Sequence, residues 1–275
     1  MSYAQVTDHL IFSFDQFQFN TASFAPAIID TSSRIQLKLG DRSYKGVYNG
    51  VNSRFLQFDY LISPSTHQHH SIGVQVYQSN MGEYIRTNSL YATYAFRLAL
   101  SPKLELSSGI NLGYKSMILD PADVGGGGTS KILASTIGIG LLSKKIKLLI
   151  GYKDFLNQDF IFPKFQITSP IVLSTYLGYN IALNQKWHLS FHTLGEFNNI
   201  NEQNYRFTAI TNWNKHLDVG AGHRTDKGTF LMAGLSNLAW QRATFSTNLS
   251  YLVIPNLSFQ NMPNQVIELT LALGY

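Results

Sequence analysis

Apolar and polar side chains alternate along most of the chain, and the pattern is clearest in the last eleven residues, QVIELTLALGY. A period of two is typical of a β-strand with two unlike faces. Chain ends usually fray, yet this alternation continues to the final aromatic residue, so we expect the C-terminus to be fixed within a sheet. The apolar positions of this alternation are Ile267, Leu269, Leu271, Leu273 and Tyr275.

The same alternation recurs along the chain in segments of about ten residues or more. Helical periodicity is weak throughout, and short helices are conceivable only in 5–19 and 153–160. The sequence therefore predicts an all-β protein of about fourteen strands. The segments span 32–41, 52–63, 69–79, 84–100, 103–118, 131–143, 145–154, 170–183, 187–198, 204–214, 216–225, 229–239, 243–254 and 265–275.

Two all-β architectures fit such strands: a water-soluble sandwich and a transmembrane antiparallel β-barrel. Lysine or arginine facing lipid at mid-bilayer costs about 2–4 kcal/mol. With the apolar parity taken as outward, Arg54 and Lys131 face outward but lie near strand ends. A sandwich would also segregate charge, so this pattern predicts two-faced strands in either architecture. The mid-strand charges of opposite parity, which form a predicted charge network in the lumen, are Lys38, Asp59, Arg97, Glu105, Lys115, Lys147, Glu196, Arg206, Asp218 and Glu268.

The connections between the predicted strands alternate between short and long. Short periplasmic turns and longer extracellular loops are typical of outer-membrane barrels, and closure of the last strand on the first leaves no open edge in lipid. A terminal strand ending in an aromatic residue also resembles the assembly signal of bacterial outer-membrane proteins. We therefore expect a barrel in the outer membrane of a Gram-negative bacterium, in contact with lipid. Its predicted periplasmic aromatic girdle is Trp187, Trp213, Trp240 and Tyr275.

Composition narrows the functional classes. Only 13% of residues are charged, and the chain is rich in aromatic residues, which argues against intrinsic disorder. The net charge of +5 comes from scattered basic residues, so no nucleic-acid partner is expected. Cysteine is absent, which excludes disulfides and thiolate metal ligands.

The N-terminus suggests a processed secretory protein. No apolar run is long enough for a membrane-spanning helix. MSYAQV lacks the features of a signal peptide, but Ser2-Tyr3-Ala4 is a small-x-small pattern, so we expect that the signal is missing or removed. The predicted division is an N-terminal periplasmic segment over 1–30 and an outer-membrane barrel over 31–275.

The predicted interior holds five basic and five acidic side chains. An ion-selective pore is expected to favour one sign of charge, so this balance favours a cross-linked, largely blocked lumen. Because a barrel of this size is too wide to be filled by side chains alone, a segment is expected inside it. The candidates are the phenylalanine-rich 153–169 and the N-terminal segment 12–27, although the N-terminal phenylalanines could instead pack beneath the barrel floor.

Motifs for catalysis or metal binding are weak. HQHH at 67–70 lacks an obvious carboxylate partner, and DPADVGGGGTS at 120–130 lacks the pattern of a phosphate or calcium loop. His188 and His192 face inward on one predicted strand, and His216 and His223 follow, but no nucleophile or acid is marked out beside them. The sequence therefore predicts no catalytic residue, cofactor or metal.

Four motifs in the first 82 residues carry a family resemblance. QFQFN at 16–20 with APA at 25–27 is similar to a Gln-Tyr-Met-Phe-Asn … Asn-Pro-Ala opening, and RSYKG at 42–46 to an Arg-x-Gln-Trp-x-Gly loop. FLQFD at 55–59 and SIGVQVYQSNMG at 71–82 fit the strand and hairpin that follow. In these motifs the chain resembles the PorP/SprF family of Bacteroidetes membrane proteins.

That family is associated with the type IX secretion system and with gliding motility. The resemblance implies a non-enzymatic outer-membrane accessory that binds secretion machinery, cargo C-terminal domains, or both, for export, surface attachment or motility. Two other functions stay open from the residues alone: a channel or hydrophobic-solute transporter, and an outer-membrane enzyme that uses His188 and His192.

Overall fold

The computed structural model describes residues 16–28, 31–45, 50–64, 67–120, 127–164, 166–198, 203–225, 228–241, 243–254 and 264–275. Three expectations lie wholly or partly outside these ranges: the processed N-terminus, most of the 5–19 segment and the centre of the glycine-rich 120–130 loop.

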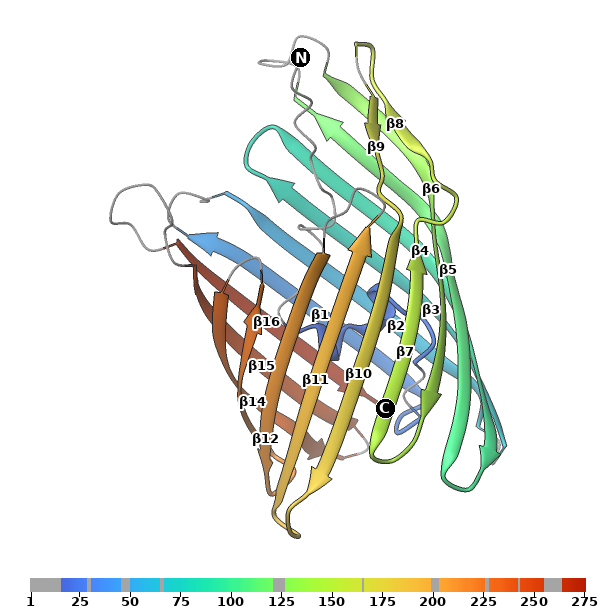
Figure 1. Cartoon of the computed structure of the whole chain (residues 1–275), viewed down its shortest axis with the longest axis vertical. Coiled ribbons are helices and arrows are strands. Elements are labelled where there is room, and N and C mark those ends of the chain that lie inside the picture. The colour runs from blue at the N-terminus through green and yellow to red at the C-terminus, as the bar shows by residue number, and fades with distance from the viewer. Residues whose placement is uncertain are drawn as a thin grey trace.

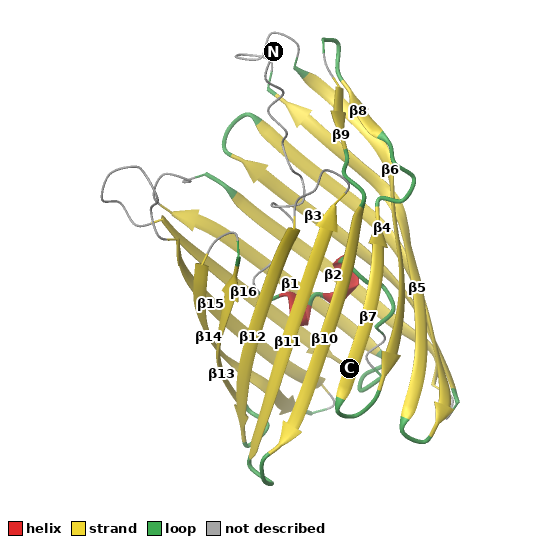
Figure 2. Cartoon of the chain, in the orientation of Figure 1, coloured by secondary structure: helices red, strands yellow, loops and turns green. Residues whose placement is uncertain are grey.

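Within the described residues, fourteen antiparallel strands close into a barrel, and two short strands pair outside it (Figures 1 and 2). No helix in this part of the chain is long and apolar enough to cross a membrane. The barrel strands are β1 (Ile35–Lys45), β2 (Asn52–Pro64), β3 (Gln68–Met81), β4 (Ile85–Ser101), β5 (Leu104–Leu119), β6 (Gly128–Leu142), β7 (Ile146–Lys153), β10 (Val172–Ala182), β11 (Trp187–Asn198), β12 (Gln203–Trp213), β13 (Leu217–Arg224), β14 (Gly228–Trp240), β15 (Ala243–Ile254) and β16 (Asn264–Gly274). The other elements are β8 (Asp159–Ile161), β9 (Gln166–Thr168) and two 3-10 turns, η2 (Phe17–Phe19) and η3 (Thr21–Ser23).

The predicted β-barrel and its fourteen strands are confirmed. The largest difference lies in the first strand, which continues past the predicted end at 41 to Lys45. Its second half, DRSYK, has too few apolar residues for the alternation to be visible. Pairing extends it, since Arg42 and Tyr44 lie opposite β16 in register.

Closure of the barrel joins β1 to β16, with Leu39 opposite Leu271. The C-terminal Tyr275 donates its N–H to the Ile35 carbonyl at 2.9 Å. Its own carbonyl accepts from the N–H groups of Arg34 and Ile35 at 2.7 and 2.9 Å. The alternation at the end of the sequence thus corresponds to a terminus held in the ladder.

The outer surface of the barrel is apolar. Leu90, Leu112, Val219 and Leu231 are between 48% and 64% exposed, and similar side chains cover the wall on every side. Soluble monomers rarely expose apolar patches larger than a few hundred Å². The closed ring with an apolar exterior decides between the two architectures in favour of the membrane barrel.

The two ends of the barrel differ, as the alternation of connections predicts (Figure 1). At the short-turn end, β4–β5, β6–β7 and β12–β13 are joined across 102–103, 143–145 and 214–216. At the long-loop end, 154–171 joins β7 to β10 and carries β8 and β9.

Candidate functional site

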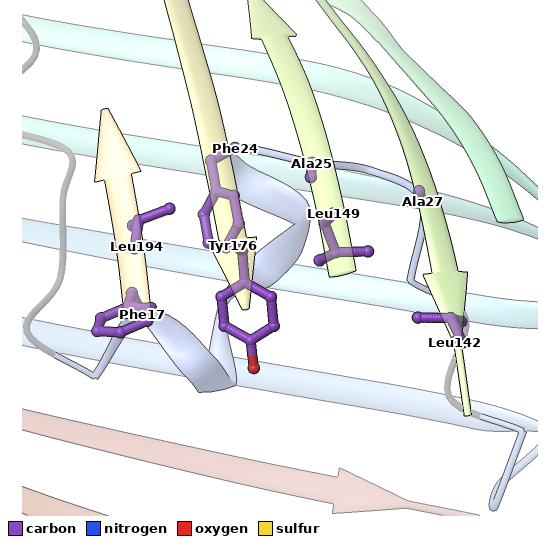
Figure 3. Packing of buried hydrophobic residues seen from close by; sticks show 8 residues of the cluster. All are labelled: Phe17, Phe24, Ala25, Ala27, Leu142, Leu149, Tyr176 and Leu194. Carbon is purple, nitrogen blue, oxygen red and sulfur yellow. The ribbon is translucent and has the colours of Figure 1, made fainter. Parts of the chain in front are cut away.

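Residues 16–28, here called the inner segment, lie inside the barrel (Figure 2). Phe17 and Phe24 flank Tyr176 of β10, with ring centroids 6.1 and 5.9 Å from the tyrosine ring. These rings pack with Leu149 and Leu194 in a buried cluster (Figure 3). Burial of each such side chain contributes about 1.5–3 kcal/mol, so the cluster anchors the segment to β7, β10 and β11.

Gln16 binds the opposite wall of the barrel. Its backbone N–H donates to Glu268 Oε1 at 2.8 Å, and its side-chain Oε1 accepts from the Thr270 hydroxyl at 2.8 Å. Further along the segment, the Asn111 amide donates to the Ala22 carbonyl at 2.9 Å. The inner segment therefore bridges β16 to β5 across the lumen.

Three glycines let the inner segment approach the wall closely. Gly109, Gly138 and Gly151 are cross-strand neighbours on β5, β6 and β7. A Cβ atom on Gly109 would lie 1.8 Å from the Pro26 carbonyl oxygen, and one on Gly151 would lie 1.7 Å from the Phe24 carbonyl oxygen. Since backbone cannot give way as a flexible side chain does, only glycine leaves room for residues 24–26 at these positions.

The sequence leaves open whether the N-terminal phenylalanines lie inside the barrel or beneath its floor. In the structure, Phe17 and Phe24 lie inside. Phe160 and Phe162, from the second candidate segment, are also buried, against Met117 and Ile132 at the long-loop end. The division into a 1–30 periplasmic segment and a 31–275 barrel stays a prediction.

All ten charges of the predicted lumen network are buried or half-buried. Two pairs among them are ion pairs, Arg97 with Glu105 and Arg206 with Glu196. Several other members contact groups outside the predicted network. For example, Asp218 accepts from the Asn212 amide at 2.6 Å. That the ten residues act together in function stays a prediction.

Lys115 pairs with a residue that sequence analysis missed. Its Nζ lies 2.9 Å from Asp154 Oδ2, and the Ser169 hydroxyl donates to the same oxygen at 3.2 Å. Burial alone would raise the pKa of the Asp154 carboxyl, but the charges of Lys115 and Lys153 and the hydrogen bonds from Lys115 and Ser169 hold that pKa below its ordinary value. The ion pair thus ties both ends of the 154–171 connection to β5.

Two fully buried arginines were also missed. Arg42 stacks on the Tyr44 ring at 4.9 Å and lies opposite Glu268 in the β1–β16 register. Arg224 lies opposite Arg206 in the β12–β13 register. Parity could have found Arg224, which shares the inward parity of Asp218, whereas the early end assigned to the first strand hid Arg42.

The residues of the predicted aromatic girdle lie at the short-turn end. All are exposed, and the Trp187 and Trp213 rings lie 6.4 Å apart on paired strands. Arg54 and Lys131, the outward exceptions, are exposed near the long-loop end, where Arg54 forms a surface ion pair with Asp41 at 2.7 Å.

A cavity of about 480 Å³ lies between the inner segment and the short-turn end. Three basic side chains line it: Lys38, Arg97 and Lys147. Its other walls combine polar groups, such as Asn248, with aromatic ones, such as Tyr176, and none of the described residues that line it is Asp or Glu.

The histidines that the structure describes do not gather into one site. His69 and His70 face opposite sides of β3, and the His70 ring pairs outside with the Tyr94 hydroxyl at 2.8 Å. Inside, His192 Nδ1 lies 2.8 Å from the Tyr176 hydroxyl. His216 and His223 are exposed, and no group of His, Asp and Glu in the described ranges could hold a metal.

Solved structures with this fold are outer-membrane barrels. The CymD monoaromatic hydrocarbon channel has a TM-score of 0.60 at 11% identity, with 88% of each chain covered. The toluene transporter TbuX of Ralstonia pickettii has a TM-score of 0.60 at 11% identity, covering 90% of this chain and 91% of its own. For the toluene transporter TodX of Pseudomonas putida the values are 0.58 and 12%, with 92% of each chain covered. At such identities the likeness shows the fold alone.

Similarity to a protein family extends over nearly the whole chain. No curated protein matches the sequence. The sequence profile of the family described as "Type IX secretion system membrane protein PorP/SprF" matches residues 9–263. Together with the barrel fold, this match assigns the chain to the outer membrane of a Gram-negative bacterium. The chain belongs to the PorP/SprF family of type IX secretion system membrane proteins.

Proposed function

We propose that this chain is a non-enzymatic accessory of type IX secretion that binds secretion machinery, cargo C-terminal domains, or both, for export, surface attachment or gliding motility. The main support for this proposal is that the interior of the barrel is occupied. The inner segment bridges opposite walls, and buried ion pairs such as Arg206–Glu196 fill the space beside it. A barrel obstructed in this way offers binding surfaces at its two ends rather than a wide passage.

In this proposal the short-turn end faces the periplasm and the long-loop end faces the exterior. Short periplasmic turns are typical of bacterial barrels, and the exposed tryptophans at that end fit the membrane interface. Machinery would then contact the short turns, and cargo the longer connections.

Affinity purification from native outer membranes tests this function. A tagged chain is extracted in mild detergent, and the co-purifying proteins are identified by mass spectrometry. We expect other secretion components or a cargo C-terminal domain, absent when an unrelated barrel carries the same tag. Recovery of the tagged barrel alone would contradict the proposal.

A channel or hydrophobic-solute transporter is the second candidate. The cavity favours it in one respect, because Phe19, Phe55 and Tyr176 line part of its wall. Proteoliposomes containing the chain would then take up labelled toluene faster than protein-free liposomes. Equal uptake by both would remove this candidate.

A further inference from the structure

Two tryptophans and two lysines form a cluster where β11 and β12 meet at the short-turn end. Trp187 lies opposite Trp213 in the β11–β12 register, and each of these residues is 42% exposed on the outer wall. Lys186 directly precedes the first tryptophan in the chain, and Lys215 follows the second by two residues. Both lysines are exposed in turns. Each lysine therefore lies close to an indole ring at the end of the barrel wall.

The position of this cluster on the wall fits a membrane interface. Farther along the same outer face, Phe191 of β11 and Val219 of β13 are exposed where the wall contacts hydrocarbon. An indole ring is apolar but carries one N–H donor, and tryptophan is therefore enriched at the level of the lipid headgroups. Lys186 and Lys215 lie beyond the tryptophans, toward the end of the barrel, which places them at the level of the lipid phosphate groups.

Hydrogen bonds fix the two turns that carry the lysines. Asn184 Oδ1 accepts from the Lys186 N–H at 2.9 Å within the first turn. The Asn214 N–H donates to the Lys186 carbonyl at 2.7 Å, which joins the first turn to the second. The Lys215 carbonyl accepts from the Asn237 side-chain amide of β14 at 3.2 Å. The backbone of both lysines is thus held before a ligand binds, and preorganisation of this kind lowers the entropic cost of binding.

Lys215 occupies a backbone position that favours glycine. The His216 N–H donates to the Trp213 carbonyl at 3.0 Å, and φ is 52° at Asn214 and 65° at Lys215, as in a type I′ turn. Asn-Gly is the preferred pair in such a turn, because a residue with a Cβ atom is disfavoured at positive φ. Lysine is therefore an unfavourable residue for the turn itself, and backbone strain of this kind concentrates at functional sites.

Both turns are basic. The segments LNQK at 183–186 and NKH at 214–216 contain no Asp or Glu. Asp218, the acidic residue closest to Lys215 along the chain, is buried on the lumen side, where it accepts from the Asn212 amide at 2.6 Å. The cluster thus combines positive charge with two indole rings on a wall that faces lipid.

We infer that Lys186, Trp187, Trp213 and Lys215 bind the headgroup of an anionic glycerophospholipid in the leaflet at the short-turn end. The lysines bind its phosphate by charge-assisted hydrogen bonds, and the indole rings pack against the glycerol and the upper acyl chains. An acidic water-soluble polypeptide is a poorer fit, because it would have to displace lipid from the tryptophans. The inference goes beyond the proposed function, since it holds whichever protein the barrel binds.

Tryptophan fluorescence of the full-length chain in vesicles tests the inference. The chain has three tryptophans, so Trp240→Phe leaves Trp187 and Trp213 as the only reporters. Phosphatidylcholine vesicles that contain the protein receive a small fraction of brominated phosphatidylglycerol or, in parallel, of brominated phosphatidylcholine, because bromine quenches indole fluorescence on contact. We expect a roughly tenfold preference for phosphatidylglycerol in the quenching titration, and this preference should fall as the salt concentration increases.

Matched variants locate the site. Lys186→Gln with Lys215→Gly should abolish the preference, and the turn should be retained because glycine adopts a positive φ readily. Lys103→Gln with Lys131→Gln is the control, which removes the same charge from the β4–β5 turn and from the outer wall near the opposite end. The control should keep the roughly tenfold preference of the parent. Heat-modifiable electrophoretic migration verifies that each variant is folded.

Two results would overturn the inference: equal quenching of the parent by both brominated lipids, or an unchanged preference in the folded variant with Lys186→Gln and Lys215→Gly. A soluble peptide rich in Glu tests the alternative partner in detergent. If this peptide binds through the same two lysines while phosphatidylglycerol shows no preference, the cluster is a protein interface and the lipid site is wrong.

Discussion

At the residue scale, the absence of a side chain at three wall positions permits the inner segment to lie inside the barrel. Gly109, Gly138 and Gly151 lie opposite one another on β5, β6 and β7. In the sequence they look like ordinary strand glycines, which usually weaken a sheet. Their structural role is clear only from the tertiary structure, in which residues 24–26 lie directly against them.

Replacing Gly151 by valine should displace the inner segment from the lumen, because the Cβ atom of the valine alone would lie 1.7 Å from the Phe24 carbonyl oxygen. Since the chain has no cysteine, Ala27→Cys provides a single label site that is fully buried in the parent. We expect a bulky maleimide to label Cys at 27 at least tenfold faster in the Gly151→Val background.

Gly195→Ala is the matched control. A Cβ atom there would meet side chains and no backbone atom among its nearest neighbours, the Thr175 hydroxyl at 3.0 Å and the Phe197 ring at 3.3 Å, and side chains can rotate away. Labelling in this background should remain as slow as in the parent. Slow labelling in both backgrounds would show that the glycine row does not hold the segment.

At the scale of elements, β7 ends at Lys153, opposite Thr136, while β6 continues to Gly128 at the long-loop end. The chain after β7 follows this uncovered edge. The Asp154 N–H donates to the Ser135 carbonyl at 2.5 Å, and the Ile161 N–H to the Ser130 hydroxyl at 2.8 Å. The first part of the 154–171 connection thus covers the free edge of β6.

Asp154→Asn should release this connection, because it leaves Lys115 buried without its anionic partner, at a cost of about 3–5 kcal/mol. The parent should lose the same contact only in acid. Its carboxylate stabilises the fold above the ordinary carboxyl pKa of about 3.9, and this stabilisation is lost as pH falls through the lower pKa of the folded state.

Limited proteolysis within 154–171 measures the release. Cleavage should be fast at neutral pH for Asp154→Asn, and slow for the parent until the pH falls below about 4. Asp41→Asn breaks an exposed ion pair instead and should cost at most about 1 kcal/mol. An Asp154→Asn variant as resistant as the parent at pH 7 would refute a structural role for this pair.

At the scale of the whole molecule, the barrel is obstructed from wall to wall. The inner segment contacts β16 through Gln16 and β5 through Ala22. The rings of Phe17 and Phe24 contact Tyr176 of β10. Apolar and polar contacts therefore act on the same segment from several directions.

In planar bilayers the intact chain should pass little current, whereas deletion of residues 16–28 should raise the single-channel conductance severalfold, because no other described segment bridges these walls. The Gly151→Val variant provides a second way to open the lumen without shortening the chain. Both variants are first checked for heat-modifiable migration. A large conductance in the intact chain would contradict the obstructed lumen.

Much of this architecture was visible in the sequence because strand parity is a local property. In a strand, each residue faces the same side as the residues two positions away. Lys115, Glu196 and Arg206 could therefore be assigned to the inner face before any pairing was known. Short turns are equally local, and the alternation of connections gave the difference between the two ends of the barrel.

By itself, then, the sequence determined the strands, their two faces, the number of crossings and the anchored C-terminus, all of which depend on residues close along the chain. Only the tertiary structure decided that the ring encloses residues 16–28, that Lys115 pairs with Asp154 and that three glycines form one row. Those contacts join strands far apart in sequence, and no local pattern fixes which inward side chains meet once the barrel closes.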